Sequence, residues 1–355
     1  RPSPADATEV HPGHISVAMA MGDSMSAAFA ARPAVGEVSE RLGEPFLPLE
    51  YRSLAFSGGE GGADTWTLPF FLRHYNDSLS GFSTRMTLMQ TPSSGYLDEG
   101  GDRLNAALSN AHSWQLMMEL EELIKQSQTV ERFGDRWKLL TVLIGANDLC
   151  DGMPADLGGL FAACSGNTTV RIALADRYEQ NLRAVLEKVR DTFGRIIVQL
   201  VSLFSVASVA KAREGHPWCS ILAPGRRLLD ECPCIDKEPS GSAPPSQAQL
   251  SALEATTEEL NSRLGRLVAE FNLQRPDFAV IEQAALRGQT IPDASYLSAI
   301  DCFHPSAMAH HGLAVTLWNG LFNRSWAPAR LDASLAPLCP GARAAVAVAA
   351  PGPKE

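Results

Sequence analysis

The sequence lacks the long apolar run that a membrane-spanning helix needs. The apolar stretch at residues 344–350 is too short and is followed by Pro351. A basic patch is also missing, because the net charge is −10 and no stripe of Lys and Arg stands out. We therefore expect no nucleic-acid partner. With 45% hydrophobic and 20% charged residues in 355 positions, the chain has the composition of a globular protein with a substantial core.

Metal and phosphate motifs are absent as well. The sequence contains neither His-Glu-x-x-His nor paired Cys-x-x-Cys. His74, His112 and His216 are not spaced as metal ligands are. The glycine-rich run at residues 57–62 is not followed by Lys-Ser/Thr, so it is a turn and not a phosphate-binding loop. We expect no metal ion and no cofactor.

Cysteine, by contrast, is plentiful for a cytosolic enzyme. There are seven, and Cys232-Pro233-Cys234 lies in a turn-rich segment where disulfides form easily. Since seven is odd, we expect Cys339 in the Pro/Ala-rich tail to be unpaired. Cys150 and Cys164 would close a local loop, and the other pairings stay open. The count favours an oxidising compartment.

Three Asn-x-Ser/Thr sequons begin at Asn76, Asn167 and Asn323. Such sequences accept N-glycans in secreted proteins. Together with the cysteines they predict a secreted or lumenal glycoprotein.

Apolar runs of strand length alternate with segments of helical periodicity. This alternation is typical of a parallel sheet with helices on both faces, in which function gathers in loops at the carboxyl ends of the strands. We expect one domain at residues 14–325, between a loose arm at residues 1–13 and a Pro/Ala-rich tail at residues 326–355. The expected strands are residues 15–22, 51–56, 137–144, 196–204 and 278–281, and the clearest helices are residues 113–126, 178–193, 250–271 and 305–322.

The first strand runs into Gly22-Asp23-Ser24 and then into small helix-forming residues. A strand-to-helix turn of this kind presents Ser24 beside a helix N-terminus, whose free N–H groups favour negative charge. That position suits a nucleophile whose reaction creates an oxyanion. Alone, the tripeptide is more typical of a turn with a helix cap.

Two later motifs supply partners for this serine. Gly145-Ala146-Asn147-Asp148 follows another buried strand, and Asp301-Cys302-Phe303-His304-Pro305 precedes the last helix. An Asp three residues before a His can bind the imidazole Nδ1–H and leave Nε2 free to accept a proton from Ser24. By itself the Asp301/His304 pair is also typical of a helix cap beside a surface histidine.

The three motifs, in this order and each after a strand, resemble the SGNH (GDSL) hydrolase superfamily. The resemblance is nearest to its phospholipase B branch, which the segments at residues 51–54, 58–69, 137–150 and 301–305 resemble; it covers most of residues 14–323. It implies a three-layer α/β/α sandwich with a parallel, flavodoxin-like central sheet. It implies no cofactor.

Carried over residue by residue, the resemblance makes Ser24 the nucleophile, His304 the general base and Asp301 its partner. The Asn147 side chain and the Ser24 backbone N–H would bind the oxyanion. A further donor comes from a glycine in an Asn-x-Ala-x-x-Gly-Ala stretch, which here reads Asn105-Ala106-Ala107-Leu108-Ser109-Asn110-Ala111. Asn110 keeps a backbone N–H and tolerates positive φ better than most residues. Gly59 is an alternative donor.

Other candidates are predicted to be structural. His310 and His311 lack a carboxylate three residues earlier and are expected on a helix surface. Cys302 is expected to anchor its loop through a disulfide, and Asp148 to support the loop that carries Asn147. The aromatic segment at residues 65–75 is expected to pack in the core, with an acyl pocket as the alternative.

These expectations favour a secreted serine esterase that cleaves acyl esters of phospholipids or lysophospholipids. Contact with lipid aggregates would have to come from apolar patches, because an acidic chain has no electrostatic attraction to anionic membranes. Two alternatives stay open. One is an esterase for another acyl ester, such as a neutral lipid or an acylated sugar. The other is an extracellular binding protein with a degenerate site, which Asn110 suggests.

Overall fold

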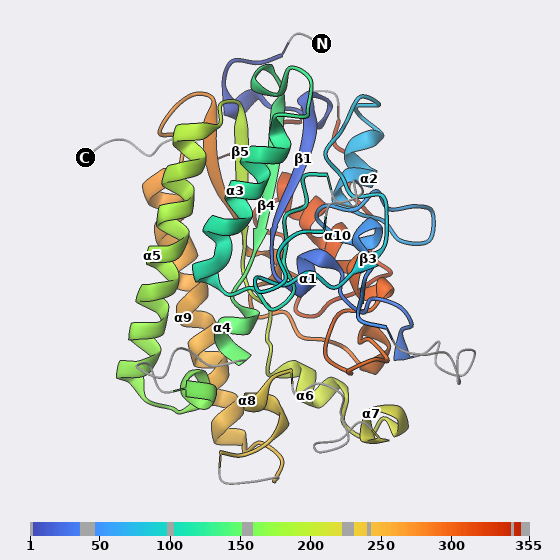
Figure 1. Cartoon of the computed structure of the whole chain (residues 1–355), viewed down its shortest axis with the longest axis vertical. Helices are drawn as coiled ribbons and strands as arrows, with labels where there is room; N and C mark the ends of the chain where they lie inside the picture. The colour runs from blue at the N-terminus through green and yellow to red at the C-terminus, as the bar shows by residue number, and fades with distance from the viewer. Residues whose placement is uncertain are drawn as a thin grey trace.

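A computed structural model of the chain describes residues 3–35, 47–97, 103–150, 159–221, 231–239, 243–341 and 344–348. Figure 1 shows a central sheet with helices on both sides of it. The strands of the described residues are β1 (Ile15–Gly22), β2 (Leu49–Glu50), β3 (Thr87–Leu88), β4 (Trp137–Leu143), β5 (Ile196–Val201) and β6 (Phe278–Gln283). Their α-helices are α1 (Ser24–Ala27), α2 (Leu68–Arg73), α3 (Leu116–Ser127), α4 (Ala146–Cys150), α5 (Thr168–Thr192), α6 (Ser208–Ala212), α7 (Pro217–Ile221), α8 (Pro233–Asp236), α9 (Gln247–Phe271) and α10 (Ala307–Phe322).

The main sheet has the strand order β1-β4-β5-β6, and every neighbouring pair is parallel. Its strands are apolar almost throughout because both faces are covered. Isolated bridges extend the β1 edge, where Val17 pairs with Ser80 and Ala20 with Asn105. The predicted parallel α/β sheet is confirmed.

Helices α3, α5 and α9 pack side by side on one face of the sheet, and α10 with α2 covers the other (Figure 1). The long helices α5 and α9 are preceded by Asn167 and Ser246, whose side chains accept backbone N–H bonds as N-caps. Their apolar residues recur at helical spacing and are buried against the sheet. The result is a three-layer α/β/α sandwich.

The predicted strand at residues 51–56 is wrong. Only Leu49 and Glu50 pair, in the small antiparallel sheet with β3, and the chain then turns into a 3₁₀ helix at Arg52–Leu54. The sequence does not reveal that Arg52 is buried, with no exposed surface, as Ala55 and Phe56 are. Its guanidinium donates hydrogen bonds to the backbone carbonyls of Asn105 and Ala107, and the 3₁₀ turn places it within reach of them.

Residues 3–14 are packed, contrary to the expectation of a loose arm. Ala7 and Val10 are fully buried, and the Trp137 indole N–H donates to the carbonyl of Pro4. At the other end of the chain, Leu331 and Val346 are buried in the same core. The polar composition of this segment suggested a loose arm, but a few buried apolar side chains are enough to pack a short segment against the core.

Three disulfides join Cys150 to Cys232, Cys164 to Cys234 and Cys219 to Cys302. The expected Cys150–Cys164 bond is wrong: each of these cysteines pairs instead with a cysteine of the Cys-Pro-Cys turn. Cys339 is free and exposed, as expected, and Cys302 is indeed a disulfide anchor. Three disulfides fit an oxidising compartment.

Among the described residues, none of the helices combines the length and the apolarity required to cross a membrane.

Candidate active site

Ser24 lies where β1 ends and α1 begins. Gly22 has φ +143°, and a Cβ there would lie 2.0 Å from the Leu143 carbonyl oxygen, so the turn requires glycine. Asp23 caps the helix, because its carboxylate accepts the Met25 N–H at 3.0 Å. The turn thus holds Ser24 as the first residue of α1 at the carboxyl edge of the sheet.

The structure brings Ser24, His304 and Asp301 together. The distance from His304 Nε2 to Ser24 Oγ is 2.7 Å, and that from His304 Nδ1 to Asp301 Oδ2 is also 2.7 Å. The other oxygen of Asp301 accepts the backbone N–H groups of Phe303 and His304 at 2.8 and 3.0 Å. A carboxylate at Nδ1 places the ring proton there, so Nε2 accepts the serine hydroxyl. All three side chains are buried.

Burial and the interaction between Asp301 and His304 together set the pKa values of these two side chains. Burial disfavours a charged imidazole, but the Asp301 carboxylate outweighs burial and raises the pKa of His304 to about 9. Burial likewise opposes ionisation of Asp301, yet the His304 charge and the hydrogen bonds to Asp301 hold the pKa of that carboxyl below its usual value. A charged imidazole is therefore favoured beside Asp301, which is what a base that takes up a proton requires.

Sequence analysis missed Glu231. Its carboxylate lies beside the pair, with ligand atoms of Glu231, Asp301 and His304 all within 4.8 Å of one another. Glu231 belongs to no recognisable motif, because the neighbouring Cys232–Cys150 disulfide, and not its own sequence context, places it beside Asp301 and His304. The three groups do not fit a metal site, since both ring nitrogens of His304 are already hydrogen-bonded.

Asn147 and Asn110 border the serine turn. Asn147 lies in the first turn of α4, and its Nδ2 donates to the Ala111 carbonyl at 2.8 Å, which leaves its second amide hydrogen for another acceptor. Asn110 has φ +64° and an exposed side chain, so the asparagine takes the left-handed conformation that glycine usually supplies. Among the described residues, the backbone N–H groups of Ser24 and Asn110 have no hydrogen-bond acceptor.

Gly59 does not offer a free donor, because its N–H is bonded to the Ala55 carbonyl at 2.8 Å. A Cβ at this glycine would lie 2.4 Å from the Ser53 carbonyl oxygen, so close backbone packing explains the residue. The alternative donor is therefore not available.

Three buried acids lie in the serine turn or next to it: Asp23, Glu119 and Asp148. Asp148 accepts the N–H and the hydroxyl of Ser113 at 2.9 and 2.6 Å, which fits its expected role in loop structure. Glu119 of α3, which sequence analysis also missed, accepts the Gly22 N–H at 2.7 Å. Burial raises the pKa of Asp23 to about 7 and that of Glu119 well above its usual value. A protonated Glu119 adds no negative charge behind the nucleophile.

The expectation of a helix-surface position is wrong for His310, whereas His311 is half-buried. His310 is fully buried against Phe56, and burial lowers its pKa to about 3. His311 stacks on Trp66 with ring centroids 4.4 Å apart. His310 is covered because α10 is buried around almost its whole circumference. The Trp66 segment packs on α10 and Trp318, so it belongs to the core.

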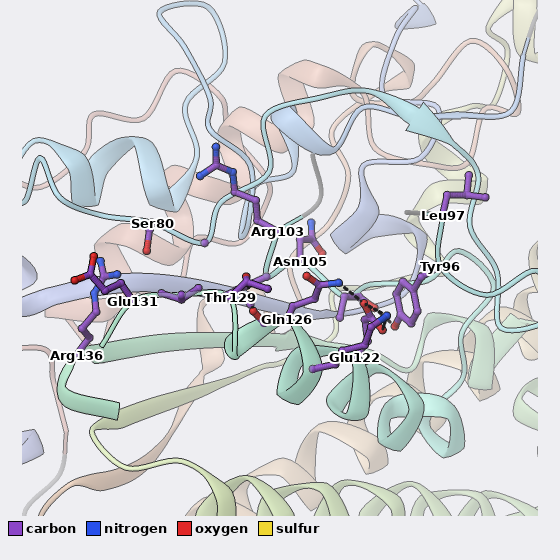
Figure 2. A pocket seen from close by; sticks show the side chains of 15 residues that line it. Ser80, Tyr96, Leu97, Arg103, Asn105, Glu122, Gln126, Thr129, Glu131 and Arg136 are labelled. Atoms are coloured by element: carbon purple, nitrogen blue, oxygen red, sulfur yellow. Dashed lines mark hydrogen bonds and ion pairs between the residues drawn. The ribbon is translucent and has the colours of Figure 1, made fainter. Parts of the chain in front are cut away.

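A cavity of about 490 Å³ lies elsewhere, between the β1 edge and α3. Figure 2 shows its polar lining, in which Gln126 is hydrogen-bonded to Glu122 while Arg103 and Arg136 come from other segments. None of the five predicted site residues lines it. Although this cavity is large, it is therefore not the candidate active site.

A parallel α/β sheet that carries a hydrogen-bonded serine, histidine and aspartate at its carboxyl edge has the architecture of an acyl hydrolase. The chain belongs to the GDSL-like Lipase/Acylhydrolase family, whose family model matches residues 19–315, and is a carboxylic-ester hydrolase.

The chain is similar to "Phospholipase B1, membrane-associated" of two mammals. It is 28% identical to the Rattus norvegicus protein over 331 residues, which cover 90% of this chain and 20% of that protein. It is 27% identical to the Homo sapiens protein over 335 residues, with the same coverage of 90% and 20%. The chain thus spans about a fifth of the length of these relatives. The resemblance to the phospholipase B branch is confirmed.

The solved structures that match the chain include two from Streptomyces species. An extracellular lipase from Streptomyces rimosus is 14% identical with a TM-score of 0.39, and the match covers 85% of this chain and 98% of that one. Phospholipase A1 from Streptomyces albidoflavus NA297 is 15% identical with a TM-score of 0.39, covering 84% and 94%.

Proposed function

We propose that this chain hydrolyses acyl esters of phospholipids and lysophospholipids through an acyl-enzyme on Ser24. The observation that carries the proposal is the continuous hydrogen-bond chain from Ser24 through His304 to Asp301. The lipid substrate class is supported by similarity to proteins named phospholipase B1.

In the proposed mechanism, Ser24 Oγ attacks the ester carbonyl carbon while His304 Nε2 takes the hydroxyl proton. The oxyanion of the tetrahedral intermediate accepts hydrogen bonds from the N–H groups of Ser24 and Asn110 and from Asn147 Nδ2. Collapse of the intermediate breaks the ester C–O bond, and His304 returns its proton to the leaving alcohol. Water, activated by the same histidine, then releases the acyl group as a carboxylic acid and restores Ser24.

Labelling with a fluorophosphonate, followed by peptide mapping, tests this mechanism. We expect covalent modification at Ser24 that disappears in a His304→Ala variant, because the serine needs its base to attack phosphorus. An unlabelled but folded wild-type protein would contradict the proposal and favour the binding-protein alternative. Turnover of phospholipid, lysophospholipid and short-chain aryl esters would then separate a phospholipase from an esterase for other acyl esters.

The pH dependence of kcat/KM gives a second expectation. His304 acts as a base only when neutral, and the pKa of His304 is raised to about 9. Activity should therefore rise with pH and level off only near pH 9, well above the pKa of an ordinary histidine. Measuring kcat/KM between about pH 6 and about pH 10 checks this. A plateau already reached near neutral pH would show that the Asp301 carboxylate does not raise the histidine pKa.

Secretion and N-glycosylation are part of the proposal. Asn167 and Asn323 are exposed sequon residues, which an oligosaccharide can reach. Asn76 is half-buried, and its Nδ2 donates to the Ile15 carbonyl at 2.9 Å. We therefore propose glycans at Asn167 and Asn323 first, with Asn76 the sequon least open to modification.

Transient contact with lipid aggregates is also proposed. Leu47, Met86 and Leu88 are large apolar side chains that are each about half exposed. They lie on or beside the β2–β3 pair, which is hydrogen-bonded through Gln90 and Ser109 to the loop that carries Asn110. An apolar surface next to the site would suit a substrate held in an aggregate.

A further inference from the structure

A fully buried ion pair lies beside the loop that carries Asn110. Arg52 and Glu50 have no exposed surface, and the guanidinium NH2 and Nε groups donate to Glu50 Oε2 at 2.7 and 2.9 Å. Arginine supplies donors in a fixed plane, so the orientation of its bonds to other groups is set once this fork is in place.

The pair is bonded directly to residues 105–111, here called the donor loop. Arg52 donates to the carbonyl oxygens of Asn105 and Ala107 at 3.0 and 2.7 Å. Glu50 Oε1 accepts the hydroxyl of Ser109 at 2.6 Å. One pair of side chains is thus hydrogen-bonded to every second residue of the loop, at Asn105, Ala107 and Ser109.

The donor loop is also tied to the other parts of the site. The Leu108 N–H donates to the Gly22 carbonyl at 3.0 Å, and Asn105 Nδ2 donates to the Ser26 carbonyl at 2.9 Å. At its end, the Ala111 carbonyl accepts Asn147 Nδ2. The loop therefore bridges the serine turn and Asn147, and its geometry decides where the Asn110 N–H lies relative to both.

A buried ion pair is weak evidence for stability, because desolvation offsets its attraction and an apolar pair of similar size often does as well. Its better-supported use is to fix one arrangement among several. The donor loop needs such fixing: it forms no regular strand, and Asn110 has a left-handed conformation that asparagine does not hold by itself. An oxyanion donor must also lie within about 3 Å of the oxygen it stabilises.

We propose that Glu50 and Arg52 are positioning residues that orient the Asn110 N–H toward the oxyanion. The inference rests on the proposed function, in which Asn110 is an oxyanion donor. Ser109 is the link: its hydroxyl is bonded to Glu50, its N–H is bonded to the Gln90 carbonyl, and its own peptide group carries the Asn110 N–H. Glu50 and Arg52 touch no substrate in this assignment.

The test compares Ser109→Ala with Ser127→Ala. Both remove one buried hydroxyl with one hydrogen bond, but Ser127 donates to the Ile124 carbonyl in α3, away from the donor loop. We expect Ser109→Ala to lower kcat about tenfold with KM nearly unchanged, because a small displacement of an oxyanion donor weakens transition-state binding only. Ser127→Ala should keep the wild-type kcat, and Ser109→Thr, which retains the hydroxyl, should recover most of the loss.

A second variant, Arg52→Lys, keeps the charge but loses the fork and should lower kcat further. Thermal unfolding of each variant controls for loss of fold. A folded Ser109→Ala protein with wild-type kcat would overturn the positioning role. Failure of the proposed function has a different signature, since the wild-type protein itself would then resist fluorophosphonate labelling at Ser24.

Discussion

Replacing Ser24 by alanine is expected to lower kcat by about 10⁶-fold while the protein stays folded. The hydroxyl is the proposed nucleophile, on which the acyl-enzyme would form. Its one hydrogen bond to a side chain is that to His304 Nε2, so its removal breaks no structural contact. Ester hydrolysis by the purified variant, followed with an aryl ester and a lysophospholipid, measures the loss.

Ser26→Ala is the matched control. Ser26 lies in the same short helix and is fully buried, and its hydroxyl has no hydrogen-bond partner among the described residues. Its replacement should therefore leave hydrolysis close to the wild-type rate. Hydrolysis that persisted in Ser24→Ala would remove this serine from the mechanism, whatever the control did.

The second large effect is expected for Asp301→Asn, which should lower kcat by about 10⁴-fold. An amide keeps the shape of the side chain but cannot stabilise the imidazolium, and it can donate to Nδ1 and so hold the wrong tautomer. The pKa of His304 should fall as well, because Asp301 is the main group that raises it. The residual activity should consequently reach its plateau at lower pH than in the wild type.

Asp293→Asn serves as the control, because Asp293 is an exposed cap of the 3₁₀ helix at Ala294–Tyr296 and asparagine caps equally well. It should change neither kcat nor the pH profile. An Asp301→Asn enzyme with a large loss of kcat but an unshifted profile would mean that Asp301 only shapes the loop.

Much of the candidate site could be predicted because the motifs follow strands. In a parallel sheet the carboxyl ends of neighbouring strands lie at one edge, so Ser24 and Asn147 had to lie near each other. His304 is 280 residues from Ser24, and it was joined to the serine by the chemistry of the Asp301/His304 pair and then by the resemblance to a known family. The periodicity of residues 250–271 and 305–322 located α9 and α10 nearly to their ends.

The features that were not predicted depend on contacts between residues far apart in the sequence. Arg52 was expected in a strand at residues 51–56, since nothing in the local sequence shows that its guanidinium forms a buried ion pair with Glu50. Glu231 reaches the site through a disulfide, and disulfide connectivity does not follow from spacing. His310 was predicted to be exposed, but it lies on a helix that is apolar and buried almost all round, where even a histidine is enclosed.

The disulfides have a consequence for proteolysis. Each spans at least 70 residues, and the intervals overlap: Cys150–Cys232 and Cys164–Cys234 enclose Cys219, and Cys219–Cys302 continues beyond them. A single backbone cut anywhere between Cys150 and Cys302 therefore leaves two fragments that are still covalently joined. One fragment carries Ser24 and Asn147, and the other carries His304. The nicked protein would remain one molecule that keeps both halves of its site until the cystines are reduced.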